Sequence, residues 1–427
     1  MATVTRLALW AIAAVVPASC YPATSPLNID IEAREASLGL LIGPSVVEVP
    51  ASIRNVFPAK DFNRPVTQTY WQTEVRSGDP SGIANHTLRQ LGNATFLAFD
   101  RGFYDVLGIK DYRQPKKVET IFTFPAGPSY ANRMVHDGTV YSPECNCIFA
   151  AELYPPKPGF SMQFLPWVWR TNLNGTAPVT EKVYPDPPLT IANGAYYHDG
   201  AVYWQQEGNY TTPGGIVRMD PLTLKTAVVL NNYLGHRFNS PNDVVMTKRG
   251  VAYFTDGYYG FDNFNDTIKP EMANGVWRWD SKTGNVRMVA GAGTGIFTNP
   301  NGVALNREET TLYITARGFA SADADGNRNI YQFDLTANQG RIAQPLLFAY
   351  SDAGFTDGIK TDKEGRVYGG VTGSVDIFDP QGTLLGKINV APGDTAVNMA
   401  WVKNWLYIYG RDKIYRVQLN TVGSQML

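Results

Sequence analysis

A short motif recurs six times along this chain of 427 residues, and it constrains the fold more than any other feature of the sequence. Each copy places Asp or Asn beside a small or polar residue, ahead of an apolar run. The copies are His136-Asp137-Gly138, Ala192-Asn193-Gly194, Pro241-Asn242-Asp243, Pro300-Asn301-Gly302, Thr356-Asp357-Gly358 and Val397-Asn398-Met399. Subtracting the numbers of successive Asp or Asn residues gives spacings of 56, 49, 59, 56 and 41 residues. Periods of about fifty residues are typical of β-propeller blades.

The residues after each motif predict a β-hairpin. For example, the apolar run Val244–Met246 leads through the turn Lys248–Gly250 into the second strand Val251–Phe254. A third strand follows in several repeats and ends at Asp, as in 217–220 and 276–280. Alternating strands bounded by Gly and Asp turns are typical of hairpins, and four-stranded sheets around one axis bury both faces. The sequence therefore predicts an all-β, six-bladed β-propeller.

Three parts of the chain are distinguished by their composition. Residues 1–20 resemble a secretory signal peptide, because Arg6 is followed by about ten apolar residues and then by Pro17-Ala18-Ser19-Cys20. This run is too short to span a bilayer, which needs about twenty residues. Residues 21–94 contain no motif and are predicted to be an N-terminal extension, and residues 95–427 are predicted to form the propeller. We expect the segment 94–107 to close the ring by pairing with the C-terminal blade, 399–419.

Charge and cysteine content narrow the partners and the compartment. With 37 basic and 38 acidic residues the formal charge is −1, which argues against a nucleic acid or anionic membrane partner. We expect a secreted protein with a small-molecule substrate. Cys145 and Cys147 are predicted to stay unbridged, since two cysteines separated by one residue seldom pair without strain. Sequons for N-glycosylation begin at Asn85, Asn93, Asn174, Asn209 and Asn265.

The six motifs also predict the position of a functional site. Loops that lead into the inner strands of a propeller meet at one end of its axis, so the motifs would place two carboxylates and four amides around one pore. Oxygen ligands without Cys or His favour Ca²⁺, Mg²⁺ or Mn²⁺. Asn-Gly and Asp-Gly pairs are also common turn dipeptides. That structural alternative is favoured for Asn193 and Asn398, and a ring that holds only water is the alternative for the others.

Several motifs resemble those of the SMP-30/gluconolactonase/LRE family. The similar segments are Asn239–Val245, Phe254–Gly260, Asn299–Ala304 and Asp357–Asp362, and the similarity extends from about residue 95 to the C-terminus. Within that family the chain is most similar to secreted fungal lactonohydrolases. The resemblance implies a six-bladed propeller with one axial divalent cation, usually Ca²⁺.

The same resemblance implies roles for individual residues. Asp137, Asn301 and Asp357 match the metal ligands, and Asn242 would contact the metal or the substrate. The cation would polarise the lactone carbonyl while Asp357 activates the attacking water. The chain departs from the family at Asp137, where Glu is usual, and this departure puts the metal affinity in question.

Further residues are candidates for binding the substrate. They are Asn193, Asp256, Tyr258, Tyr259 and His136, with His136 and His198 also weighed as acid or base groups. For Asp256 a structural role as a turn carboxylate is an equal alternative, and blade packing is the alternative for the tyrosines.

The function predicted from these residues is a secreted, metal-dependent hydrolase of small or medium lactones. The alternative, from the same resemblance, is a fungal secondary-metabolite cyclase of the hetero-Diels-Alderase type that uses the same pocket without hydrolysis.

Overall fold

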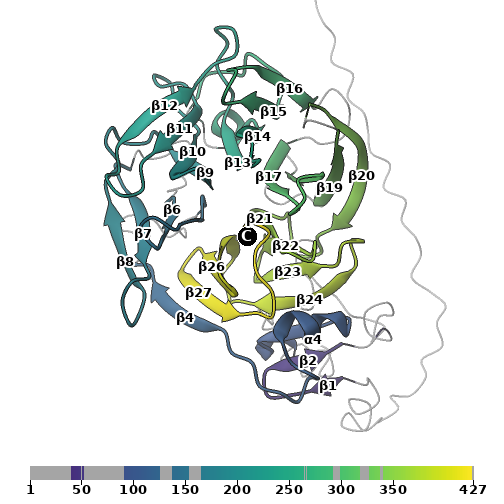
Figure 1. The fold of residues 1–427 in the computed structure, drawn as a ribbon. Helices are drawn as coiled ribbons and strands as arrows, with labels where there is room; N and C mark the ends of the chain where they lie inside the picture. The colour runs from purple at the N-terminus through teal and green to yellow at the C-terminus, as the bar shows by residue number, and fades with distance from the viewer. Residues whose placement is uncertain are drawn as a thin grey trace, which may run out of the picture.

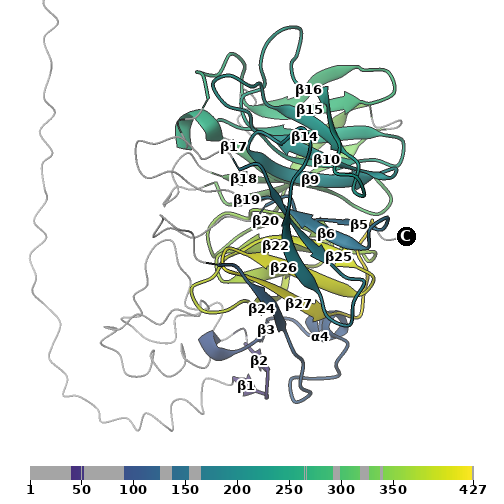
Figure 2. The ribbon, with the colours of Figure 1, turned by 90° about the vertical axis from the view of Figure 1, so that its left-hand side faces the viewer.

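The structure is a computed structural model that describes residues 40–49, 51, 91–125, 137–152, 165–263, 265, 267–291, 299–317, 327–336 and 340–425. The predicted signal peptide, most of the N-terminal extension, His136 and Asn85 lie outside these residues. The strands form sheets arranged radially around one axis, which Figure 1 views end on and Figure 2 from the side. The predicted β-propeller arrangement is confirmed.

Five of the sheets in the described residues have four strands each. They are β5 (Val140–Ser142), β6 (Cys147–Ala150), β7 (Val168–Asn172) and β8 (Val179–Val183); β9 (Ala192–His198), β10 (Ala201–Gln206), β11 (Gly215–Met219) and β12 (Thr226–Leu230); β13 (Pro241–Met246), β14 (Val251–Asp256), β15 (Gly275–Asp280) and β16 (Val286–Gly291); β17 (Asn299–Leu305), β18 (Thr311–Arg317), β19 (Asn329–Leu335) and β20 (Ile342–Tyr350); and β25 (Ala396–Val402), β26 (Trp405–Gly410), β27 (Lys413–Gln418) and β4 (Glu119–Thr123).

The remaining sheet has seven strands. Its order is β1 (Leu41–Ile42), β2 (Val46–Glu48), β3 (Phe96–Ala98), β24 (Leu384–Asn389), β23 (Ser374–Phe378), β22 (Val367–Val371) and β21 (Ile359–Thr361). Strands β21 to β24 follow one another in antiparallel order, as in the other blades. The part of the extension that the structure describes therefore enlarges this sheet at its outer edge.

Each repeat motif lies at the start of the innermost strand of a sheet. Strands β9 and β13 begin at the first residue of their motifs, and β17 and β25 begin one residue before theirs. Asp137 and Asp357 lie just before β5 and β21. Successive inner strands contact one another around the axis in the order β5, β9, β13, β17, β21, β25 and back to β5. The motifs thus share one end of the axis, here called the motif end. The hairpin turns after the inner strands lie at the opposite end, here called the turn end.

The ring is closed by a different strand from the one we expected. Strand β3 pairs with β24, and residues Gly102–Leu107 form helix α4 instead of a strand. Strand β4 is the one that pairs with β27 in the C-terminal sheet. The helix buries Phe103, Val106 and Leu107 against the core beside β24, so its apolar residues follow helical spacing. Closure still joins segments from the two ends of the chain, as the prediction required.

The prediction for Cys145 and Cys147 is wrong, because the two residues form a disulfide. Their Cα atoms lie 5.2 Å apart, within the range that disulfides need. Asn146 between them has a φ of 46°, a left-handed conformation that lets the flanking side chains meet. The sequence spacing alone could not reveal this local turn.

Four of the five sequon asparagines lie in the described residues. Asn93, Asn174 and Asn265 are exposed, and Asn209 is partly buried. None of the helices in these residues is both long enough and apolar enough to cross a membrane.

Glycines in the motifs allow neighbouring blades to approach closely. A Cβ on Gly194 would lie 2.5 Å from Asn242 O and 2.5 Å from Asp243 Cα in the next blade. Added Cβ atoms on Gly138, Gly302 and Gly358 would collide in the same way with the following blades. The third residue of the motif is therefore restricted by the space between blades.

We predict that Gly194→Ala lowers the free energy of unfolding by about 1–3 kcal/mol, because the methyl group pushes β13 away from β9. Thermal or urea unfolding would measure the change. Gly175→Ala is the matched control, since its Cβ would meet its nearest atom at 3.4 Å. Equal stability of the two variants would contradict this account of the motif.

Candidate functional site at the motif end of the axis

Five polar side chains from the motifs surround the axis at the motif end. Asp137, Asn193, Asn242 and Asn301 are each no more than 6% exposed, and Asp357 is partly buried. They come from five successive inner strands or from the residues just before them. The structure therefore brings together all the predicted metal-binding residues and Asn242.

The sixth motif is out of register by one residue. Asn398 lies where Gly358 approaches its Cα, as Gly194 approaches the Cα of Asp243. Both side chains also accept a hydrogen bond from the next backbone N–H, at 2.8 Å for Asp243 and 2.7 Å for Asn398. Asn398 thus corresponds to Asp243, and Val397 takes the position on the axis.

Asp243 and Asn398 connect adjacent blades through their side chains. The Asp243 carboxylate accepts a hydrogen bond from Val303 N in β17 at 3.1 Å. The Asn398 amide donates to Asp137 Oδ1 at 2.6 Å, and Gly138 N donates to the same oxygen at 2.7 Å. These contacts give Asn398 a structural role, and they engage one of the two oxygens of Asp137.

Some amide oxygens at the axis fit a cation. Asn193 Oδ1 and Asn242 Oδ1 are buried and accept no hydrogen bond within the described residues. Such unsatisfied oxygens are costly unless a water or an ion binds them. No group of three or more His, Cys, Asp and Glu side chains in the described ranges is arranged to hold a metal ion. A cation here would therefore depend on amide oxygens as well as on carboxylates.

The Asp357 carboxyl lies in a strongly perturbed environment. Burial and the neighbouring Asp137 raise its pKa to about 7, against the opposing effect of Arg317 and Arg411. Burial similarly raises the pKa of Asp243 to about 6. A carboxyl that titrates near neutrality can exchange a proton with water or substrate.

Three charged residues near this ring were missed in the sequence. They are Glu207, Arg317 and Arg411. In the strand pairing each lies opposite the residue that stands two positions before the axial residue of its own blade. Glu207 accepts a hydrogen bond from the Asn193 amide at 2.9 Å. All three residues share one position in their blades, at the end of the second strand or directly after it. This shared position could have identified them, but it can be recognised only when the pairing of the first and second strands is known.

The other predicted substrate-binding residues have mostly internal contacts. Tyr259 is buried and its hydroxyl donates to Pro300 O at 3.1 Å, whereas the Tyr258 hydroxyl donates to Met272 O at 3.2 Å. Asp256 is fully buried and accepts hydrogen bonds from Asn239 N and Ser240 N at 3.1 and 2.8 Å. These bonds hold the backbone of residues 239 and 240, which precede Asn242. His198 lies at the end of β9, at the turn end, away from Asp357.

The fold and this axial ring define a β-propeller with a polar site at one end of its axis. Residues 189–409 match the family model described as the SMP-30/Gluconolactonase/LRE-like region. The chain belongs to the SMP-30/gluconolactonase/LRE-like family.

Individual relatives agree with this assignment. The chain is 28% identical to lactonohydrolase oryL of Aspergillus oryzae over 313 residues, which is 68% of this chain and 69% of that protein. It is 27% identical to lactonohydrolase oryH of the same organism, over 84% of this chain and 86% of that one. It is 33% identical to a gluconolactonase of Zymomonas mobilis, over 53% of this chain and 62% of that protein.

Solved structures share the fold. A gluconolactonase from Xanthomonas campestris has a TM-score of 0.59 at 20% identity, covering 75% of this chain and 94% of that one. A putative gluconolactonase has a TM-score of 0.60 at 17% identity, covering 77% of this chain and 99% of that one.

The burial of Asp256 predicts a pH dependence of stability. Burial raises its pKa from 3.8 to about 7, so the folded protein holds this proton between those values while the unfolded chain has lost it. The free energy of unfolding should therefore fall as the pH rises through this window, by up to about 1.4 kcal/mol per pH unit from this group. Asp256→Asn should make the decline shallower in urea unfolding.

Asp220→Asn is the control for this measurement. The backbone N–H groups of Thr223 and Leu222 lower the pKa of Asp220, so its contribution changes at more acid pH and in the opposite direction. The same decline with pH in Asp256→Asn and in the parent protein would contradict the assignment to Asp256.

Proposed function

We propose that this protein hydrolyses a lactone at the motif end of the axis. The observation that supports the proposal is that the buried Asn242 and Asn301 and the partly buried Asp357 lie at the motif end of three successive inner strands. Lactonohydrolases and a gluconolactonase among the relatives support this reaction class.

The proposal includes an axial divalent cation, with Ca²⁺ as the expected ion. The buried Asn242 Oδ1, which accepts no hydrogen bond in the described residues, fits such an ion. Asp137, Asn301 and Asp357 would hold it, with the Asp137 oxygen that Asn398 and Gly138 leave unengaged. When bound, the cation would supply Lewis-acid polarisation of the lactone carbonyl.

The residues of the chain would carry the proton. Asp357 accepts a proton from the attacking water, whose oxygen adds to the lactone carbonyl carbon. The ring C–O bond then breaks, and the same proton passes from Asp357 to the leaving alkoxide, giving a hydroxy acid. Without a cation, burial and the neighbouring Asp137 raise the pKa of Asp357 to about 7, and a bound cation would lower it, which favours the ionised form that accepts the proton. Asn242 would hold the substrate in register through its side-chain amide.

The remaining parts of the proposal concern architecture and location. We propose that β21 to β24 act as the sixth blade, since β21 contacts the inner strands of the blades on both sides. We also propose secretion through the signal-like residues 1–20 and glycosylation at exposed sequons.

Asp357→Ala should lower the turnover of a responsive lactone by about 10²–10⁴-fold, because the proton acceptor is lost. A panel of small and medium lactones, assayed by acid release with and without chelator, would measure this. Chelator should abolish the activity, and added Ca²⁺ should restore it. Asp379→Ala is a control at an Asp in the turn between β23 and β24.

Hydrolysis that is unaffected by both chelator and Asp357→Ala would overturn the proposed site. Hydrolysis that needs Asp357 but tolerates chelator would remove only the cation from the proposal.

Cation binding can be measured apart from activity. Asn242→Leu should weaken Tb³⁺ binding, followed by its luminescence, by about tenfold or more, because one oxygen ligand is removed. Asn285→Ala is the matched control, since Asn285 is an exposed amide in the turn between β15 and β16. Equal Tb³⁺ affinity of the two variants would place the ion elsewhere.

A second candidate function is the secondary-metabolite cyclase, and one observation favours it. Asp137 directs one oxygen to Asn398 and Gly138, which leaves a smaller ligand set than a free carboxylate provides. A cyclase pocket needs shape and hydrogen-bond donors and does not need a strong cation site. Absence of opening for every lactone tested, together with weak Tb³⁺ binding, would favour this candidate.

A further inference from the structure

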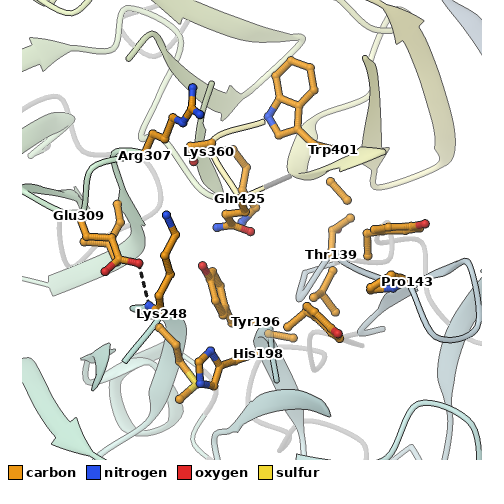
Figure 3. Close-up of a pocket in the computed structure, with 18 of the residues that line it drawn as sticks. Thr139, Pro143, Tyr196, His198, Lys248, Arg307, Glu309, Lys360, Trp401 and Gln425 are labelled. Carbon is orange, nitrogen blue, oxygen red and sulfur yellow. Dashed lines mark hydrogen bonds between the residues drawn. The ribbon is translucent and has the colours of Figure 1, made fainter. Parts of the chain in front are cut away.

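A cavity lies at the turn end of the axis, opposite the site described above. Its volume is about 400 Å³, which is enough for a small organic molecule. Figure 3 shows Tyr196, Lys248, Lys360 and Gln425 around the middle of this cavity.

One wall of the cavity is cationic. Lys248, Arg307 and Lys360 come from three successive inner strands or the turns that follow them, β13, β17 and β21. None of these three side chains forms an ion pair within the described residues, although the Lys360 charge opposes the effect of burial on the pKa of Asp137 and Asp243. Glu309 also lines the cavity, but its carboxylate accepts a hydrogen bond from Lys248 N at 2.7 Å. Asp199 is a second carboxylate that lines the cavity, and it is exposed to solvent in the turn after β9.

The facing wall is aromatic. Tyr141, at β5, and Tyr196 and Tyr197, at β9, line the cavity from the two blades that face this cationic arc. Trp401 adds a further ring from β25 and is buried. Burial raises the pKa of Tyr196 well above its ordinary value, so its hydroxyl keeps its proton and can donate a hydrogen bond.

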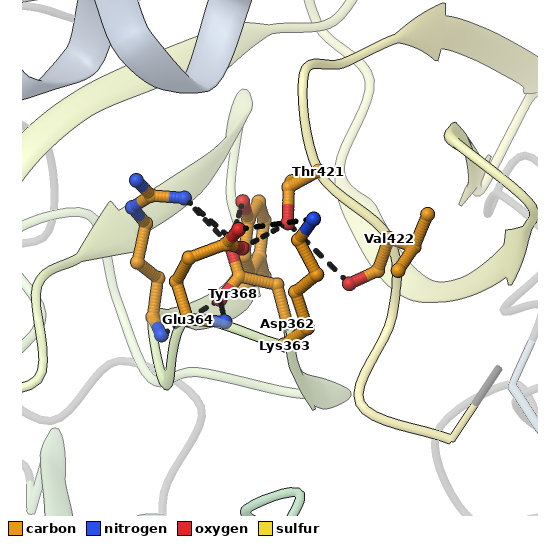
Figure 4. A network of polar contacts seen from close by, with 7 residues as sticks. Asp362, Lys363, Glu364, Tyr368, Thr421 and Val422 are labelled. Atoms are coloured by element: carbon orange, nitrogen blue, oxygen red, sulfur yellow. Dashed lines mark hydrogen bonds and ion pairs between the residues drawn. The ribbon is translucent and has the colours of Figure 1, made fainter. Parts of the chain in front are cut away.

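The C-terminal segment fixes one side of the cavity. Figure 4 shows residues 421 and 422 held against the turn after β21, where Lys363 N donates to Val422 O at 3.0 Å and Thr421 donates to Glu364. Ser424 N then donates to Thr361 O at 3.0 Å, and Ser424 and Gln425 line the cavity next to Lys360. Hydrogen bonds to β21 and to the turn after it therefore hold the C-terminal segment in place as one wall of the cavity.

We propose that this cavity binds a small aromatic or alicyclic carboxylate. The ring of the ligand packs against Tyr141, Tyr196 and Trp401, and its carboxylate accepts charge-assisted hydrogen bonds from Lys248, Arg307 and Lys360. The cavity lies at the other end of the inner strands from the lactone site, and the Lys360 charge acts on both, because it also affects Asp137 and Asp243. Binding here does not depend on the proposed hydrolysis.

Benzoate is a suitable probe, with benzamide as its uncharged counterpart. Titration into the full-length protein, followed by calorimetry and tryptophan fluorescence, should give saturable binding of benzoate, and about tenfold weaker binding of benzamide or none. Lys248→Gln combined with Arg307→Gln should weaken benzoate binding by at least about tenfold. Both residues are exposed, so these changes leave the core intact.

Two controls locate the ligand. Lys403→Gln removes an exposed cation from the turn between β25 and β26, outside the cavity, and should not change benzoate affinity. Asp357→Ala should also leave it unchanged. The proposal is overturned by absence of saturable binding to the parent protein, by equal affinity for benzoate and benzamide, by unchanged affinity in the double variant, or by loss of binding in Asp357→Ala.

Discussion

The close contact between motif residues of neighbouring blades determines the geometry of the axis. A glycine in one blade leaves room for the backbone of the axial residue in the next at Gly138, Gly194 and Gly302, and Gly358 leaves room in the same way for Asn398. Thr255 reinforces it by donating to Asn301 O at 2.5 Å in the next blade. Because protein interiors are close-packed, a shift at one such contact would displace the polar side chain beside it. The same contacts thus hold the blades together and position the site.

In two blades the motif has a larger residue in place of this glycine. Asp243 and Asn398 stand at the glycine position, and each uses its side chain to reach the adjoining blade. Asn398 thereby orients Asp137 through its side-chain amide. This hydrogen bond of 2.6 Å makes Asp137 as much a structural residue as a candidate ligand.

Much of the fold and of the axial ring could be predicted because the motif is local and repeated. Asn242 and Asn301 reveal their position through the residues directly around them. Ring closure could not be predicted in the same way, because the pairing of β4 with β27 depends on contacts between distant segments. The register of Asn398 and the approach of Arg317 and Arg411 to Asp357 also depend on strand pairing, and the disulfide depends on the backbone of Asn146.

We propose that the motif end of the axis binds a cation through amide and carboxylate oxygens. The most direct test is anomalous diffraction from crystals of the protein soaked with Mn²⁺ in place of Ca²⁺. We expect one ion on the axis, within about 2.0–2.6 Å of oxygens from Asn301 and Asp357. A single ion bound elsewhere, or no ion at the axis under saturating Mn²⁺, would contradict the account.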